Sequence, residues 1–234
     1  MIMENPWKEF AQRRSDTNMI LECEKALIED FNKQAKEKHK IPTAIFPAPF
    51  VGNVLDPQVV LLTNNPGYDY KEADRGFYKN AEVRRMFFDN MINADQSFFC
   101  LEKRYIEMSP YWDVKLKPVI EVVGREKTAK GISVIEFFPY HSVKYKSIPK
   151  QLIKKHFTEG NYLPSQLYNF ESVRQAMERG AIIIIQRGET RWKEAIPELT
   201  GKACRTNSYG NPVISSNNLP AGIFDRIVEK LRSL

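Results

Sequence analysis

Four short apolar runs divide the chain from residue 59 onward, and they occupy residues 59–62, 132–138, 181–185 and 212–214. The runs do not alternate with polar residues, which is typical of strands buried on both faces of a parallel sheet. Helical patterns lie between them at residues 82–92 and 171–180, where helices would serve as right-handed crossovers. The pattern predicts an α/β fold: a three-layer α/β/α sandwich with a central, mostly parallel four-stranded sheet.

The N-terminal residues follow a different pattern. Between residues 18 and 38 apolar side chains recur at helical spacing, which predicts one long amphipathic helix. The segment 42–57 contains four prolines and is expected to be an extended lead-in without an element of its own. We therefore expect an N-terminal helical extension over residues 1–41, followed by one α/β domain over residues 42–234.

Composition indicates an ordinary globular protein, with 234 residues of which 42% are hydrophobic. No apolar run reaches the roughly 18 to 20 residues of a membrane helix, and the N-terminus lacks the apolar segment of a secretory signal. These features favour a cytoplasmic protein without a membrane partner. Neither the cysteines nor the histidines have metal-ligand spacing, so we expect no disulfide framework and no structural metal site. They are Cys23, Cys100, Cys204, His39, His141 and His156.

The charge balance, 35 basic against 29 acidic side chains, gives a net charge of +6 and hints at a polyanionic partner. The excess concentrates in residues 141–156, which hold five lysines and no acid. A loop that contacts phosphates has this composition, and so does a solvated lysine-rich surface. Because the stretch begins where the second run ends, we favour contact with a nucleic-acid backbone, through Lys144, Lys146 and Lys150.

Polar and turn-forming residues follow each run, as TNNPGYD, EFFPYHS, QRGETRW and SSNNLP. Ligands of parallel sheets bind where strands end at their carboxyl edge. Asn64 and Asn65 are therefore candidates for the mouth of a ligand site. The alternative is that Asn-Asn-Pro-Gly is simply a favourable turn.

The order of the stretches PFVGNVLDPQVVLLTNNPGYD, VIEFFPYHS, AIIIIQRGETRW and PVISSNNLP resembles the uracil-DNA glycosylase superfamily, over residues 42–234. The resemblance implies a monomeric protein that binds DNA and excises a flipped base by hydrolysis of the N-glycosidic bond, in DNA repair, without a cofactor. It implies that Asn65 positions the attacking water and that Asn64 offers a backbone N–H to the base carbonyl. Aligned on Leu219, the His or Asn of the last family signature falls on Ser215.

The same resemblance implies a set of base-binding residues. Phe77 takes the place of a stacking aromatic, and Leu219, expected on an exposed loop, resembles an inserted leucine. Glu136 stands where the family carries an Asn that reads uracil; an ionised carboxylate only accepts hydrogen bonds, so a base with amino groups suits it better. The alternatives are that Glu136 pairs with a basic residue and that Phe77 belongs to the core. The expected substrate-binding residues are Phe77, Glu136, Tyr140, His141, Asn217, Asn218 and Leu219.

Two other functions remain open at this point. One is a nucleic-acid-binding module that keeps the fold and has lost the chemistry, which the absence of the family's imidazole in the last loop favours. The other is an α/β enzyme that acts on a small nucleotide or nucleoside, with the lysines binding its phosphate. His141 is likewise open between a role at the departing base or a phosphate and a structural role.

Overall fold

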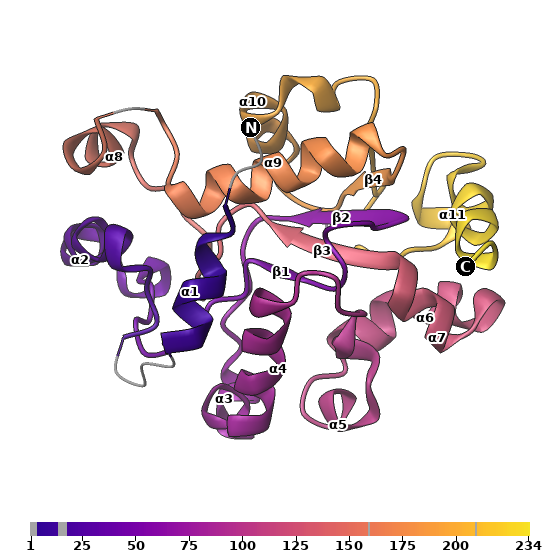
Figure 1. Cartoon of the computed structure of the whole chain (residues 1–234), viewed down its shortest axis with the longest axis horizontal. Helices are drawn as coiled ribbons and strands as arrows, with labels where there is room; N and C mark the ends of the chain where they lie inside the picture. Colours follow the sequence, from indigo (N-terminus) through magenta and orange to yellow (C-terminus); the bar gives the residue numbers. More distant parts are fainter. Residues whose placement is uncertain (1–3, 14–17, 159, 209) are drawn as a thin grey trace. The chain divides into compact units, whose positions relative to one another are not determined.

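The computed structural model describes residues 4–13, 18–158, 160–208 and 210–234. Its strands form one sheet in the order β1-β3-β2-β4-β5, and Figure 1 labels the first four of them in sequence, β1 to β4. Parallel pairing joins β2 to β4, with Val59 opposite Ile182, and joins β4 to β5, whereas β1 is antiparallel to β3. The α/β class with a mostly parallel sheet is thereby confirmed. The strands are β1 (Phe50–Val51), β2 (Val59–Thr63), β3 (Ile132–Glu136), β4 (Ile182–Ile185) and β5 (Cys204–Arg205).

Every residue of β2, β3 and β4 is buried, which explains why their apolar runs do not alternate with polar positions. The expectation of a strand at residues 212–214 is wrong, because this segment is irregular. Pro212 has no N–H to give to a ladder, and the segment is instead held by bonds described below. The strand that pairs in parallel with β4 on its other side is β5, whose two side chains are not buried. The Pro-rich lead-in also contains a strand, β1, at the sheet edge, where a neighbouring proline is tolerated.

The chain forms two compact units. Unit 1 comprises Met1–Pro49, Asn64–Ile92 and Glu136–Glu171; unit 2 comprises Phe50–Thr63, Asn93–Ile135 and Ser172–Leu234. Both units are assembled from three segments, so residues distant in sequence become neighbours within each. The proposed extension, residues 1–41, lies wholly in unit 1.

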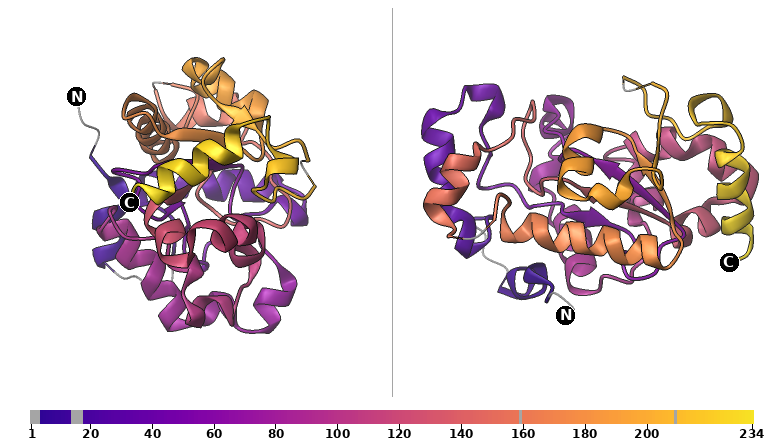
Figure 2. Two further views of the ribbon diagram at one scale, coloured as in Figure 1. Left: turned by 90° about the vertical axis from the view of Figure 1, so that its right-hand side faces the viewer. Right: turned by 90° about the horizontal axis from the view of Figure 1, so that it is seen from above.

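Among the described residues of unit 1, the regular elements are helices apart from the end of β3, and loops connect them. The single long helix expected at residues 18–38 is wrong: two 3-10 turns, Glu22–Glu24 and Glu37–His39, flank a ten-residue α2, which ends where Ala35 adopts an extended conformation. Helix α1 packs on α4, and α2 lies beside α8 (Figures 1 and 2). The helix expected at residues 82–92 is confirmed as α4. The helices are α1 (Pro6–Arg13), α2 (Lys25–Gln34), α3 (Tyr70–Asp74), α4 (Ala81–Ile92) and α8 (Lys150–His156); α9 (Pro164–Glu178) begins here and ends in unit 2.

Unit 2 holds nearly all of the sheet together with α5 (Lys103–Ile106), α6 (Tyr111–Val123), α7 (Arg125–Gly131), α10 (Glu189–Ala195) and α11 (Ile223–Arg232). Trp192 of α10, fully buried, donates from Nε1 to the carbonyl of Thr63 at 2.9 Å and so ties the helix to the end of β2. Helix α11 lies beside α6 and α7 (Figure 2). No helix within the described ranges is long and apolar enough to cross a membrane.

Candidate functional site

The loops that follow β2 and β3 are joined to each other within unit 1. The N–H of Phe138 donates to the carbonyl of Asn64 at 2.9 Å, and the N–H of Tyr68 donates to the carbonyl of Ser142 at 3.0 Å. Gly67 and Ser142 form an isolated parallel bridge. The structure thus brings together Asn64, Asn65 and the backbone around His141.

The Asn65 side chain is oriented by three acceptors around its amide nitrogen. Nδ2 lies 3.0 Å from the carbonyl of Pro66, 3.2 Å from the carbonyl of Tyr140 and 3.0 Å from Oγ of Ser142. Since carbonyl oxygens only accept, the nitrogen must face them and Oδ1 must point the other way. Among the hydrogen bonds of the described residues, those of the Asn65 side chain all use Nδ2 and none is donated to Oδ1, and the residue is half-buried. Asn65 therefore holds out one acceptor atom in a fixed direction.

The side-chain carbonyl of Asn64 lacks a hydrogen-bond donor among the described residues. Its Oδ1 is buried and has no hydrogen-bond partner within the structure described. An acceptor left in this state costs about 1–3 kcal/mol. A water molecule or a ligand N–H at this position would recover that free energy.

His141 is buried, with 5% of its surface exposed, and its Nδ1 lies 2.9 Å from the carbonyl of Gly67. Nδ1 must carry the hydrogen because a carbonyl accepts, which leaves Nε2 of the neutral ring as an acceptor, and Nε2 is buried without a partner among the described residues. Burial lowers the pKa of His141 to about 4, against the opposing effect of the Gly67 and Phe46 carbonyls. The ring is therefore neutral at physiological pH, and its contacts are those of the structural alternative.

Aromatic side chains pack around the loop that follows β2. The Tyr78 hydroxyl accepts from the N–H of Asp69 at 2.9 Å and lies 3.2 Å from the carbonyl of Gly67, and burial raises its pKa. The Tyr68 ring stacks on Tyr78 with centroids 4.9 Å apart. Phe77, expected to stack on a base, is 3% exposed and packs on Tyr78, as its core alternative requires. Sequence reasoning missed Tyr68, the half-buried ring two residues beyond Pro66; its signal was an aromatic directly after the turn.

Tyr140 belongs to a buried polar network. Its hydroxyl donates to Oε2 of Glu24 at 2.6 Å and accepts from the N–H of Leu21 at 3.2 Å, while Oε1 of Glu24 accepts from the N–H of Ser165 at 2.8 Å. Burial raises the pKa of both Glu24 and Tyr140. The Tyr140 side chain is committed to this network, and only its backbone carbonyl reaches Asn65.

Glu136, the last residue of β3, is 7% exposed. Its backbone N–H donates to the carbonyl of Pro49 at 3.0 Å, and its carbonyl accepts from Nδ2 of Asn169 at 2.8 Å. These bonds hold the strand end at the point where the chain enters the loop of Tyr140 and His141.

The last loop lies in unit 2. Nδ2 of Asn218 donates to the carbonyls of Asn211 and Val213, at 3.1 and 2.8 Å, and its Oδ1 accepts from the N–H of Ser208 at 2.8 Å. This amide is used to organise the loop. Leu219 is 3% exposed, so the expectation that it lies on an exposed loop is wrong. The expected residues that precede it are more open: Ser215 is half-buried and Asn217 is exposed.

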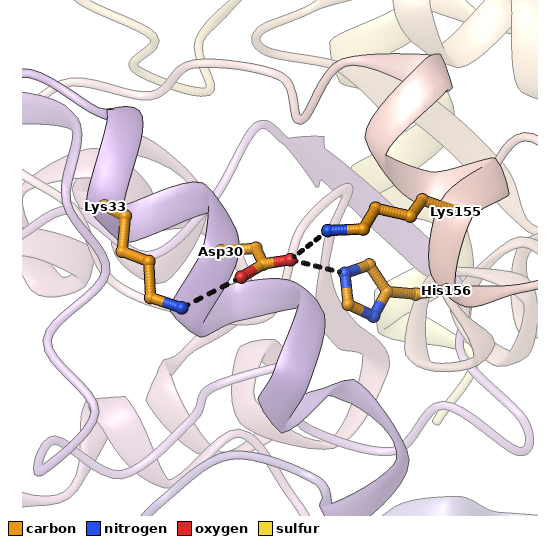
Figure 3. Close-up of polar contacts among 4 residues, drawn as sticks. All are labelled: Asp30, Lys33, Lys155 and His156. Atoms are coloured by element: carbon orange, nitrogen blue, oxygen red, sulfur yellow. Dashed lines mark hydrogen bonds and ion pairs between the residues drawn. The ribbon is translucent and has the colours of Figure 1, made fainter.

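The lysine-rich stretch divides into a part that contacts a carboxylate and a part that is exposed. On α8, Lys155 and His156 contact Oδ2 of Asp30 at 2.8 and 3.0 Å, and Lys33 contacts its Oδ1 at 3.0 Å (Figure 3). These contacts join α8 to α2. The three lysines expected to meet a nucleic-acid backbone, Lys144, Lys146 and Lys150, are all exposed.

The backbone of Lys144 brings a further cation, Lys38, to that exposed part. Its N–H donates to the carbonyl of Lys38 at 2.8 Å, and its own carbonyl lies 2.7 Å from Nδ1 of His39. For Lys144 and Lys146, no carboxylate partner occurs among residues with described positions. The backbone pairing therefore places Lys38 beside this lysine stretch.

No protein-family model matches the chain, and comparisons with curated proteins and with solved structures find no match either. Over the described ranges, no group of three or more His, Cys, Asp and Glu side chains is placed to hold a metal ion.

Proposed function

We propose that the chain is a uracil-DNA glycosylase-like protein that binds DNA and excises a base by hydrolysing the N-glycosidic bond. The observation that carries the proposal is the orientation of the Asn65 amide. Its nitrogen is held by three acceptors, so its oxygen is fixed and available to a water molecule. An acceptor in this state can orient a water for attack on the sugar C1′ without being a strong base.

The reaction requires a second group near the departing base. As the bond between C1′ and the base nitrogen breaks, its electron pair goes to the base, where negative charge develops, and the water oxygen bonds to C1′. The water gives one proton to the solvent, and the departing base takes up one proton from the solvent, so the products are the sugar hydroxyl and the neutral base. Neutral His141 brings no positive charge to this step. In this proposal the charge is met by backbone N–H groups at the turn that begins at Asn64. Tyr68, supported by its stack on Tyr78, would supply the aromatic face for the flipped base.

The test compares Asn65→Ala with Asn80→Ala on labelled oligonucleotides that contain uracil, hypoxanthine or a mismatch. Asn80 is a matched control, because its Oδ1 caps α4 by accepting from the N–H groups of Glu82 and Val83, at 2.9 and 3.1 Å. Its loss should cost about 1 kcal/mol of stability. We expect Asn65→Ala to abolish base release with DNA affinity within about twofold, and Asn80→Ala to keep base release. An active Asn65→Ala variant would remove Asn65 from the chemistry.

A second function, a DNA-binding module without catalysis, is favoured by one set of observations. The Tyr140 and Asn218 side chains are committed to internal bonds, and Leu219 is buried. The same oligonucleotides separate the two functions. Binding without base loss on any substrate would establish the module and refute excision.

A further inference from the structure

Three bonds in unit 2 bring α6 and the end of β4 to one irregular segment, Asn211 to Ile214. The Lys115 amine donates to Oδ1 of Asn211 at 2.6 Å, and the N–H of Ile214 donates to the carbonyl of Lys115 at 3.0 Å. Gln186, the residue after β4, donates from Nε2 to the carbonyl of Pro212 at 2.9 Å. The segment is itself held by Asn218, whose amide bonds to the carbonyls at positions 211 and 213. Lys115 and the residue that follows Gln186 are thus held in one neighbourhood.

That following residue is Arg187, so the segment collects two cations. Lys115 is fixed between the Asn211 oxygen and the Tyr111 ring, whose centroid lies 5.3 Å from Nζ. Arg187 is exposed at the turn into α10. Neither cation has a carboxylate partner within the chain as described.

The acidic residue that follows Arg187 most closely in the sequence, Glu189, already has ion-pair partners. Glu189 pairs with Lys193 at 2.7 Å and with Arg205 at 3.4 Å. Burial lowers the pKa of Lys115, and repulsion by Arg187 lowers it further. The bonds to residues 211–214 therefore hold two cations in one neighbourhood, an arrangement that suits a ligand of opposite charge.

We propose that Lys115, Arg187 and Asn211 form a binding site for a phosphate group. A lysine amine has three N–H donors and a guanidinium has five. Lys115 uses one of its three on Asn211, so two remain for a ligand. A phosphate group offers several acceptor oxygens and a negative charge, and guanidinium groups bind such oxygens in pairs. The site is distinct from the Asn65 loop and does not depend on base excision. The phosphate belongs either to a nucleic-acid backbone or to a free phosphate or nucleotide.

The experiment uses the full chain and two probes, inorganic phosphate and an oligothymidine without a terminal phosphate. The variants are Lys115→Met and Arg187→Met, with Lys117→Met as the control. Lys117 lies on the same helix, is exposed and contacts Glu121 at 3.9 Å, so its replacement removes the same charge outside the site. Melting temperature is measured in phosphate and in chloride at equal ionic strength, and oligothymidine affinity is measured against salt concentration.

We expect phosphate to raise the melting temperature of the unchanged chain and of Lys117→Met, and to bind about tenfold more weakly when either site cation is replaced. If the source is nucleic acid, each site variant also reduces the salt slope of oligothymidine binding by about 0.7, and Lys117→Met does not. If the site variants weaken binding of inorganic phosphate but leave the salt slope of oligothymidine binding unchanged, the source is a free phosphate or nucleotide. The proposal would be overturned if Lys115→Met and Lys117→Met showed the same rise in melting temperature with phosphate and the same salt slope of oligothymidine binding.

Acylation of the Lys115 amine provides a direct readout. An amine with a lowered pKa is a better nucleophile at neutral pH, and a bound phosphate would raise that pKa and shield the nitrogen. Mass spectrometry after brief acetic anhydride treatment should show Lys115 modified faster than Lys117, and the Lys115 rate should fall in phosphate. A Lys115 rate that is the same in phosphate and chloride would contradict the site.

Discussion

Replacing Tyr140 by Phe removes one hydroxyl from the buried network while it keeps the ring. The hydroxyl donates to Glu24 at 2.6 Å and accepts from the N–H of Leu21 at 3.2 Å, and the three residues are 1%, 0% and 5% exposed. A bond to a carboxylate contributes about 1.5–3 kcal/mol, and a buried N–H left unpaired costs about 1–3 kcal/mol. Together these effects predict a loss of about 2.5–6 kcal/mol in the free energy of unfolding.

The loss should depend on pH. Burial raises the pKa of Glu24 above its ordinary value of 4.5, so the contribution of this group to stability is complete below that value and declines as pH rises through the folded-state pKa. Without the Tyr140 donor, the ionised carboxylate keeps the bond from Ser165, and its pKa rises further. The loss in Tyr140→Phe should therefore be larger at pH 8 than at pH 5.

Urea unfolding followed by fluorescence and circular dichroism at both pH values measures this loss. Tyr145→Phe is the control, because the Tyr145 hydroxyl lies 3.4 Å from Oγ of Ser147 at an exposed position, and it should change stability by less than about 0.5 kcal/mol. A Tyr140→Phe loss below about 1 kcal/mol, or a loss greater at pH 5, would refute the reasoning.

Three further predictions concern the surface and the packing. Changing Lys144, Lys146 and Lys150 together to Glu should weaken DNA binding and reduce its salt slope by about 0.7–0.9 for each phosphate that the variant no longer neutralises; the same change at Lys79, Lys117 and Lys202 is the control, and equal slopes would identify a merely solvated surface. Asp30→Asn should lower the melting temperature at pH 7. Because Lys155, Lys33 and His156 lower the pKa of Asp30 below its ordinary 3.8, that difference should vanish as the medium becomes strongly acidic, and a difference independent of pH would contradict the ion cluster. Gly131→Ala places a Cβ 2.2 Å from Cδ2 of Leu231 and should cost about 1–3 kcal/mol in urea unfolding, whereas Gly210→Ala, with no atom within 4 Å, should cost much less.

The extent to which the fold follows from sequence depends on burial. Strands β2 and β4 were predictable because a run buried on both faces is apolar throughout. Strand β5 was not, since its two residues pair through the backbone and bury neither side chain fully. The break in the helix expected at residues 18–38 was hidden because apolar residues at helical spacing, such as Leu21 and Leu27, flank the 3-10 turn before α2, whose own buried residue is the charged Glu24.

The sequence indicated which polar residues lie at the candidate site, but it did not indicate their hydrogen-bond partners. The turn after β2 and the loop after β3 were both identified from polar residues at strand ends, and the structure joins them. That Tyr140 would face Glu24, or that Asn218 would bond within its own loop, depends on residues far away or on loop geometry, which periodicity does not encode.

Asn65→Asp illustrates the same limit and provides the sharpest test of the loop. From sequence alone, a carboxylate at this position should be tolerated or raise activity. The structure places the amide nitrogen against the carbonyls of Pro66 and Tyr140, at 3.0 and 3.2 Å, so an ionised carboxylate would set an acceptor against two acceptors. The pKa of the introduced carboxyl should therefore rise, and each unit of that rise costs about 1.4 kcal/mol once the group ionises.

The variant should match the unchanged chain in stability near pH 4 and become progressively less stable toward pH 8, because the raised folded-state pKa removes stability as pH increases. Asn80→Asp is the control with the opposite sign: Oδ1 of Asn80 already accepts two N–H groups at the start of α4, so a carboxylate there keeps both bonds and gains from the helix terminus. If Asn65 orients the water, excision by Asn65→Asp should rise over the same pH range in which its stability falls, since only the ionised group supports the cationic sugar. Urea unfolding and base release measured on the same samples from pH 4 to pH 8 decide the matter. A stability difference that stays constant with pH, or that follows the trend of Asn80→Asp, would mean that the amide nitrogen does not face those carbonyls and that Oδ1 is not the atom held out to water.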